Sequence, residues 1–329
     1  MNKSDIVHLI LNSKKKNNAR EKAIAFAPVN IALCKYWGKR VQELNLPVTS
    51  SLSMELPNRG TKTQLTITSG SSDELICNGE RVNSTTDFFK KTTSFLDLFR
   101  QQPKKFFRID TQNQIPLGAG LASSASGFAA LVLALNKLFD WNCSEKELSI
   151  LARLGSGSAS RSVCSGFVEW ERGERADGMD SYARSLGPIW PELRLGILMI
   201  SREEKPISSR VAMELTLQTS ILYSAWPKQV EHDLNLLKLA IHEKDFELLG
   251  QTAECNALAM HATMLAARPP ISYTQLGTWS AILKIWALRK EGLQVYFTQD
   301  AGPNLKLLFL EEDRKAVEEA FPEIEVDHS

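Results

Sequence analysis

The stretch PLGAGLASSASG, from Pro116 to Gly127, constrains the fold more than any other part of this 329-residue chain. It carries no charge, consists almost entirely of small residues, and leads directly into the apolar run FAALVLALNKLF. That run predicts a buried helix, which we place from Leu121 to about Phe139. Because Gly disfavours a helix interior by about 1 kcal/mol relative to Ala, the glycines require a separate reason. The pattern favours a buried helix whose first turn stays open to a ligand.

Phosphate is the ligand that such a turn suits best. The first turn of a helix exposes unpaired backbone N–H groups and a partial positive charge, and small side chains let a phosphate approach them. Gly118 and Gly120 allow tight turns, while the hydroxyls of Ser123, Ser124 and Ser126 can bond phosphate oxygens or ligate Mg²⁺. The alternative is a small-residue helix packed closely on another helix. The stretch is neither a Walker A loop nor a dinucleotide fingerprint, because it lacks the residues of both.

The charge balance of the chain argues for a local anion site. There are 39 basic and 38 acidic residues, so no global excess favours nucleic acid or a membrane surface as partner. The five cysteines are scattered and odd in number, which disfavours a disulfide framework or a zinc site and favours a reducing compartment. We expect no signal peptide and no transmembrane helix. Residues 1–20 are expected to form an extension, as a surface helix or a frayed tail.

Two further segments combine cations with small residues. GSGSASRS, residues 155–162, places Arg161 among hydroxyls, where it could grip a carboxylate or phosphate with two hydrogen bonds. KYWGK places Lys35 and Lys39 on either side of an aromatic pair at the end of a strand, where they could hold a polyanion. The alternatives are an ordinary surface arginine and a solvated basic loop.

One acidic residue follows a strand near the C-terminus. In TQDAGPN, Asp300 stands at the corner between a strand and a Gly-Pro turn. A carboxylate there could accept a proton from a substrate hydroxyl, although such a corner commonly hosts only an Asx-turn.

Hydrophobic periodicity predicts an α+β protein. The N-terminal half reads mainly as strands, including one over residues 23–37 with a break at Pro28. A helix over residues 144–155 has a capping box formed by Ser144 and Glu147 and ends at Gly155. Helices dominate from about residue 211 to 289. We therefore predict two domains, residues 21–192 and 193–329.

Taken together, these segments resemble the diphosphomevalonate decarboxylase family of the GHMP kinase superfamily. The similarity runs from about Ala23 to the end of the chain with the motifs in the family's order, and as a set the motifs are highly specific. The motifs are APVNIALCKYWGKR (27–40), LPVTSSLSMEL (46–56), PLGAGLASSASGFAAL (116–131), GSGSASRS (155–162), DGMDSYA (177–183), PPISY (269–273) and DAGPN (300–304).

The resemblance implies a GHMP kinase fold. Its N-terminal domain would be ribosomal-S5-domain-2-like and its C-terminal domain ferredoxin-like, with the active site in the cleft between them. The implied reaction is ATP-dependent: phosphorylation of the 3-hydroxyl of mevalonate 5-diphosphate, then loss of phosphate and CO₂ to give isopentenyl diphosphate. The resemblance also implies a Mg²⁺ requirement, a cytoplasmic location and a homodimer.

The resemblance also assigns roles to residues. Asp300 would lie at the 3-hydroxyl as general base or electrostatic partner, and Arg161 would hold the C1 carboxylate. Lys35 would be the third catalytic residue. The substrate would also meet Tyr36, Lys39, Ser156, Gly157, Ser158 and Ser209. ATP would meet Gly118, Gly120, Leu121, Ala122, Ser123 and Ser124, with Ser124 near Mg²⁺.

Three other functions remain open on the same fold. Some relatives decarboxylate mevalonate 5-phosphate, and others only phosphorylate the 3-hydroxyl. A non-enzymatic binding or regulatory protein would be expected to have lost the acid or the arginine. Because Asp300, Arg161, Lys35 and Lys39 are all present, the complete reaction on the diphosphate is favoured.

Overall fold

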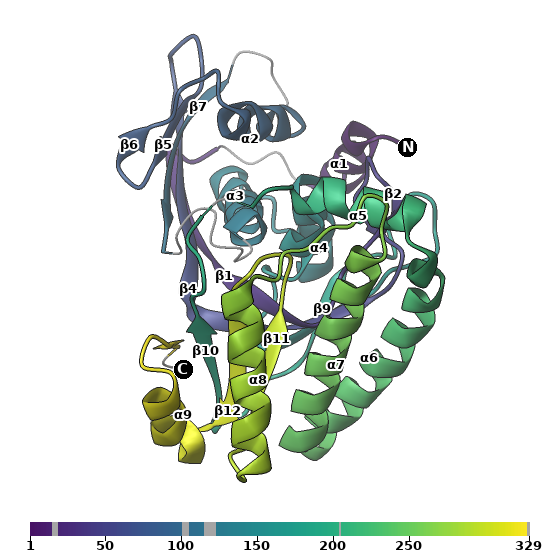
Figure 1. The fold of residues 1–329 in the computed structure, drawn as a ribbon. Coiled ribbons are helices and arrows are strands. Elements are labelled where there is room, and N and C mark those ends of the chain that lie inside the picture. The colour runs from purple at the N-terminus through teal and green to yellow at the C-terminus, as the bar shows by residue number, and fades with distance from the viewer. Residues whose placement is uncertain (15–18, 101–104, 115–122, 204, 328–329) are drawn as a thin grey trace.

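The computed structural model describes residues 1–14, 19–100, 105–114, 123–203 and 205–327. Its fold is α+β, as the sequence predicts, and contains a seven-stranded sheet, a four-stranded sheet and a two-stranded sheet in the described part. The chain runs from the large sheet and its helices, in purple to teal, to a second region of helices and strands, in green to yellow (Figure 1).

The elements are as follows. The helices are α1 (Lys3–Leu11), α2 (Asp87–Asp97), α3 (Ser123–Phe139), α4 (Glu145–Gly155), α5 (Ser209–Thr219), α6 (Trp226–Glu243), α7 (Phe246–Leu265), α8 (Leu276–Lys290) and α9 (Arg314–Ala320), with short 3₁₀ helices η1 (Gly157–Ser160), η2 (Ile221–Ala225) and η3 (Glu311–Asp313). The strands are β1 (Lys22–Cys34), β2 (Lys39–Val41), β3 (Leu46–Pro47), β4 (Ser51–Thr68), β5 (Glu74–Cys77), β6 (Glu80–Arg81), β7 (Phe106–Asn113), β8 (Phe167–Trp170), β9 (Ala183–Gly187), β10 (Leu193–Leu198), β11 (Val295–Gln299), β12 (Leu305–Leu310) and β13 (Glu325–Val326).

The large sheet is built on the long pair β1 and β4. Its order is β6-β5-β7-β4-β8-β9, and β1 pairs antiparallel with β4 along its length. The expected break at Pro28 is a register shift between Pro28 and Val29 inside one continuous strand, because a bulge accommodates the missing N–H without ending the pairing. The strand ends at Cys34, so residues 35–38 of the KYWGK motif form a loop and Lys39 begins β2.

Two helices of the first region follow their sequence signals. The described part of the helix predicted after the small-residue stretch is α3, which packs on β1 and β4 with Ala129, Ala130 and Leu135 fully buried. In α4 the Ser144 hydroxyl accepts a hydrogen bond from the Glu147 backbone N–H, and the Glu147 carboxylate accepts one from that of Ser144. The predicted capping box and the end at Gly155 are confirmed.

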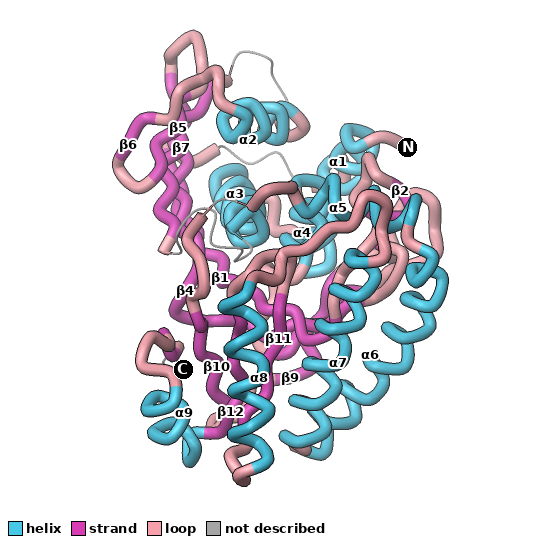
Figure 2. Tube along the Cα trace, in the orientation of Figure 1, coloured by secondary structure: helices cyan, strands magenta, loops and turns pink. Residues whose placement is uncertain are grey.

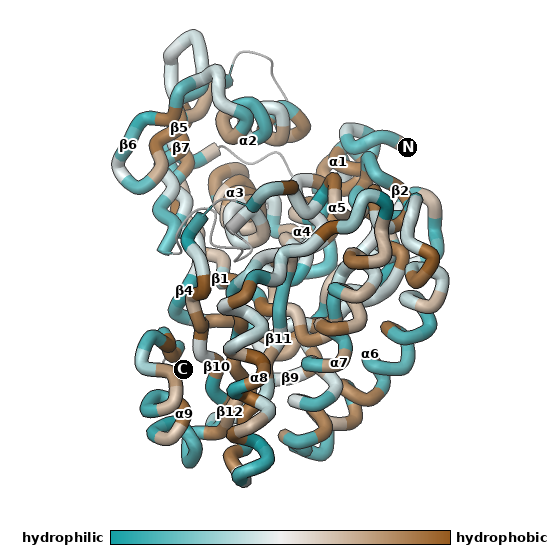
Figure 3. Tube along the Cα trace, viewed as in Figure 1, coloured by the Kyte–Doolittle hydropathy of each residue, from teal (hydrophilic) through white to brown (hydrophobic). Residues whose placement is uncertain are grey.

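The four-stranded sheet has the order β11-β12-β10-β13 and is covered on both faces. One face, with Leu307 and Phe309, packs in a cluster with Ile282 of α8 and Val317 of α9. The opposite face contributes Tyr296 and Leu308 to a second core that also contains residues of α6, α7 and β1. Helices therefore lie beside the strands of this region in Figure 2, and the apolar residues concentrate where the layers meet in Figure 3. The predicted domain boundary near residue 193 stays a prediction.

The N-terminal extension forms a helix that belongs to the core. Asn2 caps α1 in a capping box, and Ile6, Val7, Ile10 and Leu11 are buried in the same cluster as residues of α3 and α4. A frayed tail is therefore ruled out for this helix. No helix in the described ranges combines the length and apolarity needed to cross a bilayer.

We expect Ile6→Ala to lower the free energy of unfolding by about 2–5 kcal/mol, because it leaves a cavity at a fully buried position. The measurement is urea unfolding of purified protein. Leu9→Ala is the matched control, since Leu9 lies on the same helix with 53% of its surface exposed. Equal unfolding midpoints for the two variants would contradict the packing of α1.

Candidate active site

A cleft of about 430 Å³ gathers most of the predicted site residues. Its walls come from the end of β1, the loop around η1, the start of α5 and the turn after β11. Six basic side chains line it, and Asp300 is the one carboxylate among the described lining residues. The basic residues are Lys35, Lys39, Lys91, Arg161, Lys205 and Arg210.

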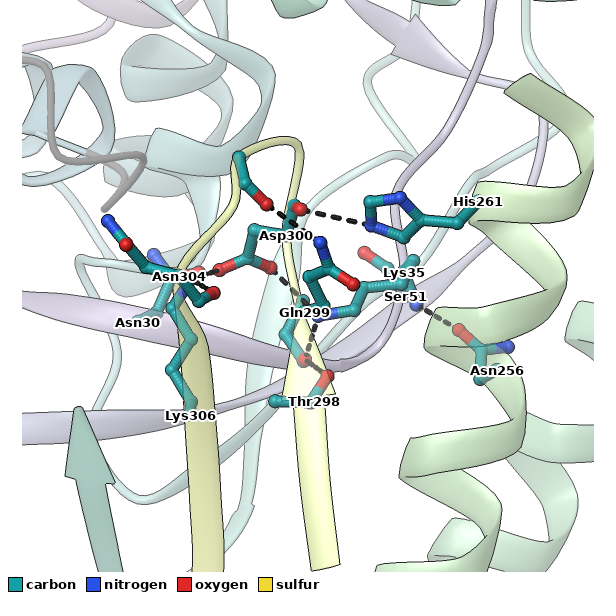
Figure 4. Close-up of polar contacts among 12 residues, drawn as sticks. Asn30, Lys35, Ser51, Asn256, His261, Thr298, Gln299, Asp300, Asn304 and Lys306 are labelled. Atoms are coloured by element: carbon teal, nitrogen blue, oxygen red, sulfur yellow. Dashed lines mark hydrogen bonds and ion pairs between the residues drawn. The ribbon is translucent and has the colours of Figure 1, made fainter. Parts of the chain in front are cut away.

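Asp300 lies between two ammonium groups. The Lys35 Nζ is 2.8 Å from Asp300 Oδ1, and the Lys306 Nζ is 3.0 Å from Oδ2, so each carboxylate oxygen has its own cation (Figure 4). Burial raises the pKa of Asp300, but Lys306 and Lys35 outweigh burial and hold that pKa well below its usual range. The carboxylate is therefore a fixed negative charge at neutral pH.

Lys35 is held by contacts from two elements. Its backbone N–H donates to the Asn256 side chain of α7 at 2.8 Å, and its Nζ donates to the Ala32 carbonyl at 2.8 Å. Burial lowers the pKa of Lys35 to about 8, even though Asp300 raises it. His261, also on α7, lies with its Nε2 3.1 Å from the Asp300 carbonyl oxygen, and burial lowers its pKa to about 4. His261 is thus neutral at physiological pH and positions the turn that carries Asp300.

Arg161 follows η1 and is 3% exposed. Its Nε donates to the Asn30 side chain at 3.1 Å, and its Nη1 donates to the Ser51 hydroxyl. Asn30 is fixed in turn by donating to the Ser162 hydroxyl at 2.6 Å. Burial lowers the pKa of Arg161 to about 10, which leaves the guanidinium charged at neutral pH. The arginine is therefore pre-oriented in the wall of the cleft and is not the surface arginine of the alternative interpretation.

Tyr36 and Gly157 form a close contact in the same wall. A Cβ on Gly157 would lie 2.7 Å from the Tyr36 hydroxyl oxygen, so only glycine fits beside this ring. The Tyr36 ring stands edge-on to Trp170 with centroids 4.8 Å apart. Its hydroxyl is buried and has no hydrogen-bond partner among the described atoms. A buried, unpaired phenol in a cleft is suited to a ligand oxygen.

Lys39 lies in the part of the cleft that faces α5. Its Nζ donates to the Asn45 side chain at 2.7 Å. Burial, together with the nearby cations Arg210 and Lys3, lowers the pKa of Lys39 to about 8. Ser209 is the first residue of α5, next to Arg210. This corner contains more positive than negative charge among its described groups, as an anion site requires.

The hydroxyls predicted for the phosphates lie together. The Ser124 and Ser156 Oγ atoms are 3.4 Å apart, as are those of Ser156 and Ser158. Ser123 begins α3, but its side chain is not described. The predicted ATP contacts Gly118, Gly120, Leu121 and Ala122 lie outside the described residues.

A second, smaller cavity adjoins the cleft. It has a volume of about 190 Å³ and shares Ser124, Phe128 and Lys91 with the cleft. Most of its other lining is apolar or carries a hydroxyl, as in Leu75, Ile109, Thr111 and Leu131. It is suited to a flat, mainly apolar group attached to phosphates in the cleft.

Sequence reasoning missed several residues of the site. Four of them supply positive charge: Lys306, Lys205, Arg210 and Lys91. Four others position neighbouring groups of the site: Asn30, Ser51, Asn256 and His261. Only Lys306 has a visible sequence signal, since it is a single lysine inside the otherwise apolar strand LKLLFL. The others depend on residues that are distant in the sequence.

Comparison with known proteins gives a consistent result. Two family models match, the "Diphosphomevalonate decarboxylase-like N-terminal domain" over residues 27–183 and the "Mevalonate 5-diphosphate decarboxylase C-terminal domain" over residues 195–326. Diphosphomevalonate decarboxylase mvd1 of Aspergillus fumigatus is 39% identical over 319 residues, covering 90% of this chain and 78% of the relative. The human diphosphomevalonate decarboxylase is 35% identical, with 87% and 76% covered.

Solved structures show the same relationship. The mevalonate diphosphate decarboxylase of Staphylococcus aureus superposes with a TM-score of 0.87 at 36% identity, covering 93% of this chain and 95% of that chain. A structure described as MDDEF in complex with MVAPP, AMPPCP and magnesium superposes with a TM-score of 0.85 at 40% identity, with the same coverage. The GHMP kinase fold expected from the motifs is confirmed.

Proposed function

Because the chain belongs to the diphosphomevalonate decarboxylase family, we propose that it converts mevalonate 5-diphosphate and ATP to isopentenyl diphosphate, ADP, phosphate and CO₂. The observation that supports this most is the cleft with six basic side chains around one ionised carboxylate. Two polyphosphate substrates bring many negative charges together, and phosphoryl transfer depends mainly on positioning them and neutralising that charge.

In the proposed reaction, the 3-hydroxyl oxygen of the substrate bonds to the γ-phosphorus of ATP, its proton passes to an oxygen of the transferred phosphate, and the bond from the γ-phosphorus to ADP breaks. The C3–O bond then breaks and releases phosphate. Loss of the C1–C2 bond as CO₂ supplies the electron pair of the new C2–C3 double bond. Asp300 would hold the 3-hydroxyl through a hydrogen bond and stabilise positive charge that develops at C3. Lys35, 2.8 Å from Asp300, would orient this carboxylate and meet the transferred phosphate.

Arg161 would hold the C1 carboxylate of the substrate. Its guanidinium is fixed through Nε and Nη1, so the direction it presents to the cleft is set before substrate binds. A carboxylate held at a fixed angle to C3 can break its bond to C2 when the 3-phosphate leaves. This assignment uses the planar, bidentate geometry of arginine, which lysine does not provide.

The diphosphate of the substrate would lie against the cationic corner of the cleft. Lys39 and the unpaired hydroxyl of Tyr36 would donate to its oxygens, together with the loop that carries Ser156, Gly157 and Ser158. Ser209 and Arg210 at the start of α5 would bond the outer phosphate. A substrate with a diphosphate accounts for this number of hydrogen-bond donors better than a substrate with a monophosphate does.

The residues fit ATP and Mg²⁺ as well. The phosphates of ATP would extend from the start of α3 toward Lys35, while the smaller cavity would take the base. Ser124 would ligate Mg²⁺ together with phosphate oxygens, and it lies between the two cavities. Bound Mg²⁺ would neutralise charge on the phosphates. We further propose a cytoplasmic homodimer, for which light scattering should give twice the mass of one chain.

The direct test is product analysis. Purified protein with Mg²⁺-ATP should release ADP and CO₂ in equal amounts from mevalonate 5-diphosphate, and neither at a comparable rate from mevalonate 5-phosphate or mevalonate. ADP without CO₂ would identify a 3-kinase instead. Preference for the monophosphate would show that the corner of the cleft with Lys39 and Arg210 does not bind a second substrate phosphate.

We expect kcat/KM for mevalonate 5-diphosphate to fall as the pH rises above about 8. Lys35 and Lys39 both have pKa values lowered to about 8, so each loses its positive charge above that pH. The pH dependence of kcat/KM reports groups of the free enzyme, so the measurement is initial rates at low substrate concentration. Lys39→Arg serves as control, because it keeps its charge and leaves Lys35 to titrate. A kcat/KM that stays constant up to about pH 10 would contradict the lowered values.

A further inference from the structure

Lys306 provides the second ammonium group in contact with the Asp300 carboxylate. It belongs to β12, is 1% exposed and does not line the cleft. Its Nζ lies 3.0 Å from Asp300 Oδ2, while Lys35, which does line the cleft, lies 2.8 Å from Oδ1. Figure 4 shows Lys306 rising from its strand toward the turn that carries Asp300.

The position of Lys306 in the sheet is one that a hydrophobic residue would normally occupy. Its neighbours Leu305 and Leu307 pack into the cluster with α8, so Lys306 lies on the opposite face, as Leu308 does. A buried ammonium is costly unless an anion and hydrogen bonds compensate it. Within the described residues, the Lys306 ammonium contacts the Asp300 carboxylate and, at 3.4 Å, the Asn304 carbonyl.

We propose that Lys306 is a positioning residue: it holds one oxygen of the Asp300 carboxylate so that the other faces Lys35 and the cleft. The inference rests on the proposed function, because the role of Asp300 is defined by that reaction. Lys306 never touches substrate. It acts through the carboxylate, whose rotation about its last bond would otherwise be restrained by Lys35 alone.

Among the described residues, the charged groups that interact with Asp300 favour its ionised form. Lys35 at the end of β1 and Lys306 on β12 contact it directly, Lys205 and Arg161 lie near enough to interact with it electrostatically, and neutral His261 contacts its backbone carbonyl. A carboxylate so surrounded aligns a hydroxyl but accepts its proton poorly. Asp300 is therefore an anion that orients the substrate hydroxyl, and Lys306 keeps its carboxylate ionised.

A double-mutant cycle tests this role. Lys306→Met keeps an unbranched side chain that is slightly shorter, and removes its charge. We expect it to lower kcat about tenfold or more. In an Asp300→Asn background the same change should alter kcat less than about twofold, since the group it acts on is already gone.

Lys238→Met is the matched control. Lys238 pairs with the buried Glu169, so its removal also breaks an ion pair to a buried carboxylate, away from the cleft. It should change kcat by less than about twofold, and by the same factor in both backgrounds. Full additivity of Lys306→Met and Asp300→Asn would overturn the inference.

A second measurement does not depend on activity. Titration of ¹³C-labelled aspartate by NMR, with the Asp300 signal assigned through Asp300→Asn, should show Asp300 protonating at higher pH in Lys306→Met than in wild type. Identical titrations would overturn the inference even if the enzyme is a decarboxylase. Failure of the proposed function would show differently, as wild-type protein that releases no CO₂. If Lys306→Met unfolds, Lys306→Gln replaces it in both measurements.

Discussion

Asp300→Asn will reduce kcat for CO₂ release by at least about 100-fold, which is the usual size of the loss when a positioned catalytic group is removed. The amide has nearly the same shape as the carboxylate but no charge. It can neither stabilise positive charge at C3 nor hold Lys35 and Lys306 by ion pairing. Substrate should still bind, because the cationic groups for its diphosphate are untouched. Initial rates of CO₂ and ADP release measure the effect.

Stability must be measured beside activity, because this variant leaves two buried ammonium groups without their anion. Removing one partner of a buried ion pair commonly lowers the free energy of unfolding by about 3–5 kcal/mol. Urea unfolding identifies a variant that is inactive only because it is unfolded. Asp97→Asn is the control, since it removes a carboxylate that pairs with Arg100 at 2.6 Å outside the cleft. A folded Asp300→Asn enzyme with wild-type kcat would disprove the site assignment.

Arg161→Lys will lower kcat/KM by about 100-fold or more although it keeps the positive charge, because lysine cannot replace a bidentate donor. The ammonium cannot reach Asn30, Ser51 and the substrate carboxylate together, so the carboxylate loses its fixed direction. CO₂ release should fall more than ADP release, since the arginine is assigned to the group that leaves as CO₂.

A variant at an exposed arginine is the control for Arg161→Lys. Arg81→Lys changes a side chain that is 75% exposed and outside the cleft, and should leave both product rates unchanged. If Arg161→Lys folds and releases CO₂ at the wild-type rate, the carboxylate is held by another group. If ADP release and CO₂ release fall by the same factor, Arg161 acts on the phosphates instead.

Much of the local structure was predictable. Alternation and helical spacing led to the α+β class, and the capping box of Ser144 and Glu147 marked the start of α4. These signals depend on residues within a few positions of one another, so tertiary contacts change them little. The role of Pro28 was misjudged because a bulge, which depends on the partner strand, absorbs the irregularity.

The candidate site was only partly predictable. Lys35, Arg161 and Asp300 stood out because each lies in a motif of small residues or at a strand end, and the structure brings all three to one cleft. The groups that set their orientation and charge did not stand out. Asn256 has no unusual sequence context, and its function depends on where α7 packs against the end of β1.

By itself, the sequence determined the elements, the chemical inventory of the site and the family to which the chain belongs, because these depend on residue types at short spacing. The tertiary structure alone decided the electrostatic state of that site. Lys35 and Asp300 are 265 positions apart and become an ion pair only when β1 and β11 meet. Burial there lowers the pKa of Lys35, whereas Lys306 and Lys35 lower the pKa of Asp300 against the effect of burial. No pattern along the chain records either effect.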